Sequence, residues 1–571
     1  MYNKIKKMMT KKQMKFLYFF IFLSFLAMIL ETASIGLTIP FIQVLIEEDL
    51  SPKLIEIFNF LNIYPSSKAQ FIIVLLSSIG ILFTSKVLFL TYFSYAQVKL
   101  IADLRVSLSD KLYNAYLNKP YIFHLQNNSS KLIRNIDEIS YVVSLVSSLI
   151  TLVLEFIVFL GILALVLWYE PKAPLLVIIF FGLFGFLFFK KVQIKAKGWG
   201  ESRQVYSGFR LKYLREAFAS IKDIKILQRS KEITKIFTEN NKSLNIFELK
   251  QNFVNTLPRL WLEWLVIVAF IFLILFMIFL GRELNYIVLL LGLFAAAAFR
   301  IMPSLTRIMN SIQKIIFYLP TINSIYKEFE EIHAIDQSNN LSKEEISLKK
   351  QIVLDNINFR YSRSSPKVFK NINLSIKSGT TIGLVGQSGI GKTTLINLIL
   401  GLIKPTEGTI KTDGINIFDK LKTWQSQIGY VPQDIYLIDD TIRKNVAFAL
   451  PEEKIDDVAV KKAIKNAKLD GLVNNLSNGL NTKIGEFGDR ISGGQRQRIA
   501  IARALYIDPK ILILDECTNS LDLNTEKEII NEVNSLKGKK TVIIVAHRLS
   551  TLENCDHIYK IDSEGLKLEK N

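Results

Sequence analysis

The chain contains little cysteine and comparatively little acid for its length. Two of its 571 residues are cysteines, Cys517 and Cys555, and both lie in the polar C-terminal part without the spacing of metal ligands. This excludes a disulfide-stapled fold and a cysteine metal site, and it is typical of a reducing compartment. The 51 acidic residues are outnumbered by 71 Lys and Arg, which gives a formal net charge of +20.

The basic excess does not indicate a nucleic-acid partner, because the Lys and Arg residues flank apolar runs and form no separate basic domain. Half of the residues are hydrophobic and 39 are Phe, which indicates several membrane spans. The basic N-terminus leads into a long apolar run that carries Glu31 and lacks an A-x-A cleavage site. We therefore expect a first span there and not a signal peptide.

Six apolar segments have spanning length, over residues 16–46, 71–95, 141–169, 174–189, 261–280 and 286–309. The connections after the second and fourth segments are long, basic and poor in Gly and Pro, so they read as helical extensions into the cytoplasm. The positive-inside rule then places both termini in the cytoplasm. The connection "SPKLIEIFNFLNIY" between the first two segments is either a short external amphipathic helix or a loop.

After Tyr318 the apolar runs stop. We expect a transmembrane domain over residues 1–325, a polar linker over 326–350 and a separate domain over 351–571, where short strand-like runs alternate with amphipathic helical patterns. The predicted fold class is a membrane α-helical bundle of six spans followed by a C-terminal α/β P-loop NTPase domain.

The strongest motif is "TIGLVGQSGIGKTTLINLIL", in which an apolar strand leads through Gly386-x-x-x-x-Gly391-Lys392-Thr393 into a helix. This is a P-loop in its required strand–loop–helix context. Backbone N–H groups around Ser388 and Gly389 would close on the phosphates of ATP at the helix N-terminus. We expect Lys392 to contact the phosphates and the Thr393 hydroxyl to ligate Mg²⁺.

The partner motif is "PKILILDECTNSLD", a buried strand that ends in Asp515 and Glu516. One carboxylate can hold Mg²⁺ while the other polarises water, so we assign Asp515 to the metal and Glu516 to general-base catalysis. Between the two motifs, Ser492-Gly493-Gly494-Gln495 opens a helix whose N–H groups and dipole favour an anion.

With these motifs in order, the C-terminal domain resembles the nucleotide-binding domain of ABC transporters, and six spans before one such domain resemble an ABC exporter half-transporter. "ISGGQ" matches the family signature, with Ile491 where Leu is commoner, and Cys517 and Asn519 replace small residues beside the carboxylates. The resemblance implies the following further roles: Tyr361 stacks on adenine, Thr394 binds ATP, Gln433 senses and ligates Mg²⁺, Asp522 crosses the dimer interface, His547 contacts the γ-phosphate in catalysis, and Glu486 touches the membrane domain.

The ATP sites of the family form between two subunits, so one chain with one such domain implies a dimer. Both half-sites look intact, which favours a homodimer over a heterodimer. Two cytoplasmic stretches, "LNKPYIFHLQNNSSKL" and "REAFASIKDIKIL", resemble the coupling helices of exporters, although plain hairpin tips give the same pattern.

A polar stripe runs along the sixth span, where Arg300, Ser304, Arg307, Ser311 and Lys314 follow one another at steps of four and three. Such a stripe should face the bundle interior or a water-filled cavity. At ~1.5 Å per residue, Lys86, Arg259 and Arg300 lie roughly 21–33 Å from the outer ends of their spans.

These basic side chains, with Arg307, could bind the phosphates of an anionic lipid head group. Alternatively they snorkel to the interface, or pair with Glu31, Glu155 or Glu263.

The stretches "ETASIGLTIPFI", "LPRLWLEWL" and "FRIMPSLTRI" are similar to the membrane domain of bacterial lipid-linked oligosaccharide flippases of the protein-glycosylation type. That resemblance implies a polyprenyl-diphosphate glycan as cargo, flipped across the bacterial inner membrane. The alternatives are export of a peptide, a lipid or a hydrophobic drug, a soluble ABC ATPase that acts on nucleic acid or ribosomes, and an ATP-gated channel. No peptidase-like extension precedes the first span, which weakens a leader-cleaving peptide exporter.

Overall fold

The computed structural model describes residues 1–37, 44, 68–169, 172–279, 281, 284–336, 346–516, 523–546, 548–562 and 565–570. The chain divides into two compact units: residues 1–119 with 127–338, and residues 120–126 with 339–571. The division between 338 and 339 falls inside the segment expected to be a linker. The predicted external helix after the first span lies outside the described residues.

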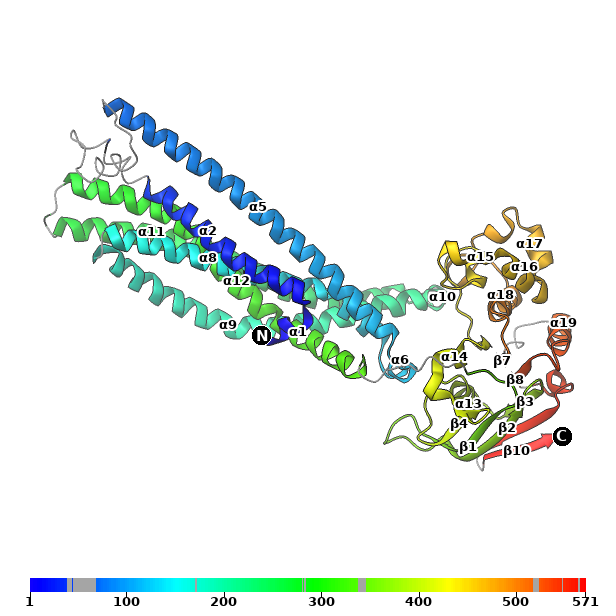
Figure 1. Cartoon of the computed structure of the whole chain (residues 1–571). Helices are drawn as coiled ribbons and strands as arrows, with labels where there is room; N and C mark the ends of the chain where they lie inside the picture. The colour runs from blue at the N-terminus through cyan, green and yellow to red at the C-terminus, as the bar shows by residue number, and fades with distance from the viewer. Residues whose placement is uncertain are drawn as a thin grey trace. The chain divides into compact units, whose positions relative to one another are not determined.

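Unit 1 is entirely helical in its described part (Figure 1). Its helices are α1 (Tyr2–Met8), α2 (Lys11–Gly36), α5 (Lys68–Leu117), α7 (Ser129–Asp137), α8 (Ile139–Tyr169), α9 (Lys172–Ala219), α10 (Ile221–Ile226), α11 (Ser230–Phe279) and α12 (Leu284–Asp336).

Apolar helices long enough to span a bilayer cover Lys11–Gly36, Ala69–Leu117, Ser129–Trp168 and Ser230–Phe279. The remaining predicted spans, 174–189 and 286–309, fall on α9 and α12, where part of the side chains lies outside the described residues. The long helices continue well beyond the apolar runs, so the basic connections are helical extensions as predicted.

Local signals fix the helix ends and their packing. Thr10 caps α2 in a capping box with Gln13, which satisfies N–H groups that a helix start leaves free. The bundle then closes where glycines let helices approach. A Cβ at Gly161 of α8 would lie 2.4 Å from Met28 Cγ of α2, and one at Gly200 of α9 would lie 2.0 Å from the Phe317 carbonyl oxygen of α12.

The described part of unit 2 contains two sheets. An antiparallel sheet has the order β2-β1-β4-β5, and a six-stranded sheet has the order β10-β9-β3-β8-β7-β6, in which only β10 pairs antiparallel. The strands are β1 (Gln351–Phe359), β2 (Phe369–Lys377), β3 (Thr381–Gly386), β4 (Glu407–Thr412), β5 (Ile415–Asn416), β6 (Ile428–Val431), β7 (Ile511–Asp515), β8 (Thr541–Val545), β9 (His557–Asp562) and β10 (Gly565–Lys570).

The helices of unit 2 are α6 (Tyr121–Gln126), α13 (Lys392–Ile399), α14 (Leu421–Gln425), α15 (Ile442–Val446), α16 (Asp457–Asn466), α17 (Asp470–Asn475), α18 (Gly493–Tyr506) and α19 (Leu523–Asn534). Strands β7 and β8 are buried along their whole length, which explains why their sequences, ILILD and TVIIV, are almost continuously apolar.

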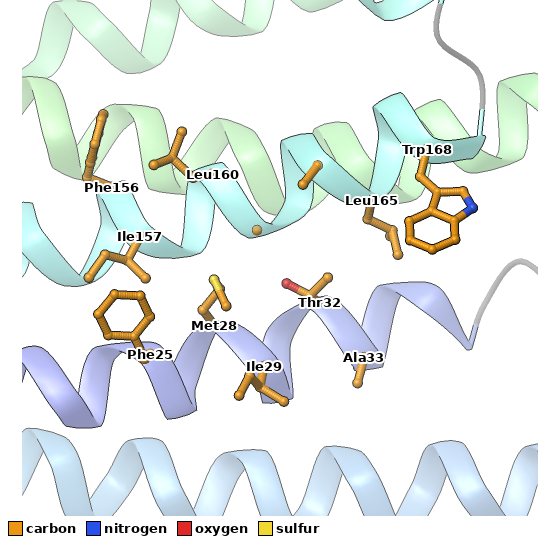
Figure 2. A pocket seen from close by; sticks show the side chains of 12 residues that line it. Phe25, Met28, Ile29, Thr32, Ala33, Phe156, Ile157, Leu160, Leu165 and Trp168 are labelled. Atoms are coloured by element: carbon orange, nitrogen blue, oxygen red, sulfur yellow. The ribbon is translucent and has the colours of Figure 1, made fainter.

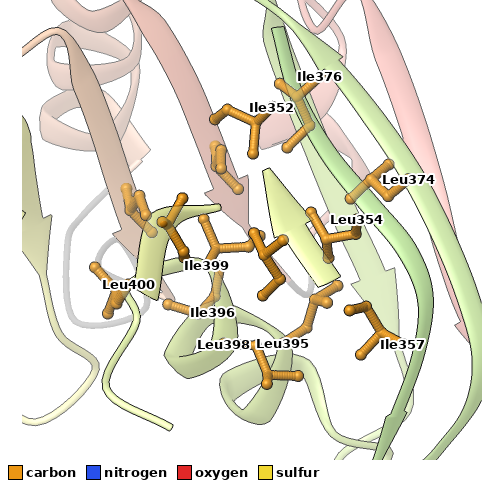
Figure 3. Close-up of a cluster of buried hydrophobic side chains, with 14 of the residues drawn as sticks. Ile352, Leu354, Ile357, Leu374, Ile376, Leu395, Ile396, Leu398, Ile399 and Leu400 are labelled. Carbon is orange, nitrogen blue, oxygen red and sulfur yellow. The ribbon is translucent and has the colours of Figure 1, made fainter. Parts of the chain in front are cut away.

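Two hydrophobic cores hold unit 2 together. In the first, the side chains of β1 and β2 point toward those of α13, and Ile352, Ile376 and Ile396 are completely buried (Figure 3). The second lies where α16 and α18 pack, with Val460 and Ile499 completely buried. Each such side chain contributes about 1.5–3 kcal/mol on burial, so the loops between these elements are anchored to a rigid frame.

Candidate functional site

The P-loop lies between β3 and α13, as its motif predicted. Gly389 and Gly391 have φ of 79° and 112°, a left-handed conformation that favours glycine. A Cβ at Gly386 would lie 2.8 Å from the carbonyl oxygen of Ile561, so this glycine is needed for close approach to β9. The loop therefore depends on glycine at these three positions. It connects the end of β3 to the start of α13.

Lys392 is buried at the first position of α13, with 5% of its surface exposed. Its Nζ donates to the carbonyl oxygen of Gly386 at 2.9 Å, and it lies 3.6 Å from Oε1 of Glu516. The lysine thus joins the P-loop to the end of β7, which places one positive charge beside the two carboxylates that follow that strand.

Asp515 is completely buried at the end of β7. Burial, and then the adjacent Glu516 carboxylate, raise the pKa of Asp515 to about 6, although the Thr393 and Tyr430 hydroxyls hydrogen-bond to it. Its Oδ1 has no hydrogen-bond partner among the described residues. A buried carboxylate oxygen without a partner, beside the Thr393 hydroxyl, is a donor set that fits Mg²⁺.

Glu516 follows with a left-handed backbone, at φ 50°. Its backbone N–H donates to the carbonyl oxygen of Val545 at 3.0 Å, and Gln433 Nε2 donates to its Oε2 at 2.9 Å. A non-glycine residue in this conformation is strained, so the contacts with β8 and Gln433 hold the carboxylate in place. The Glu516 carboxylate is therefore held between Gln433 and Lys392.

Tyr361 lies beside the P-loop helix. Its hydroxyl hydrogen-bonds to the Thr394 hydroxyl at 2.9 Å, and its ring packs edge-on against Phe359. Lys392, Glu516 and Gln433 are linked by contacts of 2.9 to 3.6 Å, and Asp515 is the neighbour of Glu516 in the chain. Tyr361 contacts Thr394, which follows Lys392 by two residues in α13.

Ser492 and Gln495 bond to each other at the start of α18. Ser492 Oγ accepts from the Gln495 N–H at 3.3 Å, and Gln495 Oε1 accepts from the Ser492 N–H at 3.0 Å. This capping box leaves Ser492 exposed, with Gly493 and Gly494 partly exposed, at a helix N-terminus. Two predicted site residues, Asp522 and His547, lie outside the described residues.

Sequence reasoning missed Tyr430. Strand β6 pairs in parallel with β7, with Tyr430 opposite Ile513, and the tyrosine hydroxyl lies 3.5 Å from Asp515 Oδ2. Burial raises the pKa of Tyr430, so the group stays a neutral hydrogen-bond donor. The sequence places Tyr430 three residues before Gln433. This position indicates a site residue only weakly unless it is known that β6 lies beside β7.

Helix α6, in the first stretch expected to be a coupling helix, is part of unit 2. Gln126 Nε2 lies 3.5 Å from the carbonyl oxygen of Tyr361. Helix α10, in the second stretch, is part of unit 1.

In unit 1, charged side chains from α2, α5, α8 and α12 form one cluster. Glu31 pairs with Lys86 at 2.9 Å and with Arg300 at 2.8 Å. Glu155 lies 3.6 Å from Arg300 and also pairs with Arg307. Both carboxylates are almost fully buried, whereas the Arg307 side chain is 53% exposed.

Ser304 completes this cluster: it donates to Glu155 Oε2 at 2.6 Å and accepts from Arg300 at 2.9 Å. We call Glu31, Lys86, Glu155, Arg300, Ser304 and Arg307 the membrane charge cluster. Its three cations face two carboxylates, which leaves one excess positive charge. The fourth predicted basic residue, Arg259, pairs with Glu263 of its own helix at 2.8 Å, and its side chain is 75% exposed.

An apolar groove of about 640 Å³ lies between α2 and α8 (Figure 2). Phe25, Met28 and Ile29 line it from α2, and Phe156, Leu160 and Trp168 line it from α8. Thr32 contributes a hydroxyl that has no hydrogen-bond partner among the described residues.

Comparison with known proteins agrees with this organisation. A model of the ABC transporter transmembrane region matches residues 14–302, and a model of the ABC transporter matches residues 369–519. An ATP-dependent lipid A-core flippase of Cupriavidus pinatubonensis is 44% identical over 216 residues, which are 38% of this chain and 37% of that protein. The match thus spans little more than a third of that relative.

Another ATP-dependent lipid A-core flippase, from Shewanella denitrificans, is 29% identical over 494 residues, 84% of this chain and 78% of that protein. A solved structure of a bacterial Atm1-family ABC exporter with ATP bound shares the fold with a TM-score of 0.73 at 19% identity, over 97% of this chain and 94% of that one. Together these findings confirm the predicted fold class.

Proposed function

The chain belongs to the ABC transporter family, and from this premise we propose that it is an ATP-driven exporter that flips a polyprenyl-diphosphate oligosaccharide across the bacterial inner membrane. It acts as a homodimer, with both termini and the nucleotide-binding domain in the cytoplasm. The membrane charge cluster is the observation that carries the choice of cargo.

ATP hydrolysis is assigned to the site around the P-loop. Lys392 binds the phosphates together with the N–H groups of the loop from Gly386 to Gly391. Glu516 takes a proton from the attacking water on a carboxylate oxygen, and Gln433 holds that carboxylate through its 2.9 Å hydrogen bond. Thr393, Gln433 and Asp515 would hold Mg²⁺, which neutralises phosphate charge when it is bound. His547 is assigned to the γ-phosphate by family resemblance.

The open end of α18 supports the proposed homodimer. Ser492 to Gln495 present N–H groups at a helix N-terminus, which favours an anion. In the proposed dimer this end meets the ATP held by the P-loop of the second copy, with Asp522 at the interface. Each chain then supplies one half of two equal sites.

The cargo assignment rests on the charge imbalance of the membrane charge cluster. Charges inside a membrane span are costly unless they are paired, and here, among the described residues, three cations share two carboxylates. An anionic head group would balance the excess positive charge, and Arg300 and Arg307 can bond to phosphate oxygens in bidentate geometry. Lys86 would add a third contact. The names of the flippase relatives support a lipid as cargo.

A second candidate cargo is a peptide, a lipid or a hydrophobic drug without an anionic head. The apolar groove between α2 and α8 favours it, because its lining offers dispersion contacts and a single hydroxyl (Figure 2). Competition between a neutral hydrophobic compound and the anionic lipid separates the two candidates.

The test is ATP-dependent flipping of a fluorescent polyprenyl-diphosphate oligosaccharide in proteoliposomes. We compare the wild type, Arg300→Leu, Arg300→Lys and Arg259→Leu, and we measure lipid moved per ATP hydrolysed. Removal of the Arg300 charge should lower this ratio at least tenfold. The Lys variant should retain part of it, and the exposed Arg259 serves as the comparison. A wild type that hydrolyses ATP but moves no such lipid contradicts the cargo assignment.

A further inference from the structure

The N-terminal segment, which comprises α1 and the start of α2, has one set of side chains packed on α12 and another set that is exposed. One face is docked on α12: Ile5, Met8 and Met9 are buried, and Lys4 Nζ donates to Asn323 Oδ1 at 2.7 Å. Lys7 adds an ion pair with Glu330 at 3.6 Å. The ammonium groups of Lys4 and Lys7 also lie 5.3 and 5.7 Å from the centre of the Tyr326 ring. These contacts therefore hold α1 against the C-terminal part of α12.

Four other lysines belong to this segment, one on α1 and three at the start of α2. Lys6, Lys11, Lys12 and Lys15 are exposed, and none has an acidic partner in the part of the chain that the structure describes. We call these four residues the N-terminal lysine surface. They contrast with Lys4 and Lys7 of the same segment, both of which have partners on α12.

The position of the N-terminal lysine surface is unfavourable for the helix alone. Lys11 and Lys12 lie in the first turn of α2, which contains no acidic residue. A helix N-terminus carries a partial positive charge, so lysines at this position destabilise the helix. Four unpaired ammonium groups within ten residues also repel one another. An external anion would offset both effects.

The residues that follow identify where such an anion would be found. Phe16, Phe19 and Phe22 are exposed on α2 directly after Lys15, at the start of the apolar span. Lysine side chains at the end of a spanning helix extend to the head-group region, where their charge is solvated. The lysine surface is thus placed at the height of lipid phosphates.

We propose that Lys6, Lys11, Lys12 and Lys15 bind the head groups of anionic phospholipids in the cytoplasmic leaflet. This inference rests on the orientation given under the proposed function. Because Lys4 and Lys7 fix α1 to α12, lipids bound at Lys6 of the same helix also hold the C-terminal end of α12 at the membrane surface. A basic cluster directly beside a membrane span is the arrangement expected for recognition of anionic lipid.

The experiment uses the full chain in nanodiscs that contain photoactivatable phosphatidylglycerol or photoactivatable phosphatidylcholine at equal amounts. Crosslinks are mapped on residues 1–22 of the wild type and of a variant with all four lysines changed to Gln. A first control changes the same four lysines to Arg, which retains the charge. A second control changes Lys461, Lys465, Lys527 and Lys539 of unit 2, all exposed, to Gln.

In the wild type and in both controls, phosphatidylglycerol should label residues 1–22 at least tenfold more than phosphatidylcholine does, and 0.5 M salt should reduce this ratio. The quadruple Gln variant should show equal labelling by the two lipids. Single Lys→Gln variants should each lower the ratio by up to about fivefold, which keeps the test valid if the quadruple variant misfolds. Equal labelling of the wild type by the two lipids overturns the proposal.

The outcome is independent of the cargo. If the lysine surface selects phosphatidylglycerol but no lipid-linked glycan is moved, the proposed function fails and this inference stands. If the glycan is moved without any lipid selectivity at residues 1–22, only this inference fails.

Discussion

Glu31 of α2 and Arg300 of α12 form an ion pair between two spanning helices, with Oε1 of the glutamate 2.8 Å from Nη2 of the arginine. Lys86 of α5 approaches the same carboxylate at 2.9 Å, so one glutamate neutralises cations from two other helices. The arginine that the sequence places inside an apolar span therefore has an internal partner.

This arrangement predicts that Glu31→Gln destabilises the helical unit. The variant leaves Lys86 without a carboxylate and Arg300 with Glu155 alone, and the loss of one partner from a buried ion pair costs about 3–5 kcal/mol. Thermal unfolding in detergent should show a lower Tm. The double variant Glu31→Gln, Arg300→Gln should recover part of the loss because the cluster returns to its original net charge, and Lys86 alone then lacks its partner. Equal stability of Glu31→Gln and the wild type would contradict the pairing.

A second prediction concerns Glu516. The Gln variant keeps the shape of the side chain and can still contact Gln433, but it cannot accept a proton from water. ATP turnover should fall by about 10²–10⁴-fold, while ATP binding is retained. Gln433→Ala leaves the carboxylate but removes its 2.9 Å hydrogen bond, so a smaller loss is expected. Steady-state phosphate release and nucleotide binding, measured on the same preparations, separate the two effects. A Glu516→Gln variant with more than a tenth of the wild-type rate would exclude the general-base role.

Asp515 gives a prediction about pH. Its pKa is raised to about 6 in the folded protein, whereas an unfolded aspartate titrates near 3.9. Between these values the folded state binds the extra proton, so this residue stabilises the fold below about pH 4, and that contribution is lost as the pH rises to about 6. The loss is on the order of 3 kcal/mol without metal.

The measurement is calorimetric unfolding of the full chain in EDTA, at several values of pH between 4 and 7. The Asp515→Asn variant serves as the control, because it lacks this titration and retains all others. From pH 4 to pH 6 the wild type should lose free energy of unfolding relative to the variant, so the variant becomes the more stable of the two by an increasing margin. Mg²⁺ with ATP should reverse that difference above pH 6. A difference that stays constant with pH would show that Asp515 titrates normally.

That Lys392 lies beside the carboxylates after β7 could be predicted from the sequence because short contiguous motifs carry these residues. The P-loop glycines, Lys392 and the carboxylates after β7 need only a local strand and turn to be recognised. The membrane charge cluster is different, since Glu31 and Arg300 are 269 positions apart. Their contact depends on which faces of α2 and α12 are turned toward each other, and the sequence does not give that. Helical periodicity predicted that Arg300 and Arg307 share a face, but it could not show that Glu155 lies against both. The pairing of Arg259 with Glu263, four residues later, was one of the alternatives that the sequence left open.

The packing of α9 against α12 gives the last prediction, which compares two glycines on one helix. A Cβ at Gly200 would lie 2.0 Å from the carbonyl oxygen of Phe317, whereas a Cβ at Gly198 meets nothing within 4 Å. Gly200→Ala should therefore force the helices apart and cost about 1–3 kcal/mol.

Gly198→Ala should be neutral or stabilising by up to about 1 kcal/mol, since alanine is the better helix former. Both variants add the same methyl group two residues apart on α9, so differences in expression or in general helix propensity cancel. Thermal unfolding of the two variants, with the wild type alongside, measures the contrast. If Gly200→Ala unfolds at the same temperature as Gly198→Ala, then α9 and α12 do not make this close contact at Phe317.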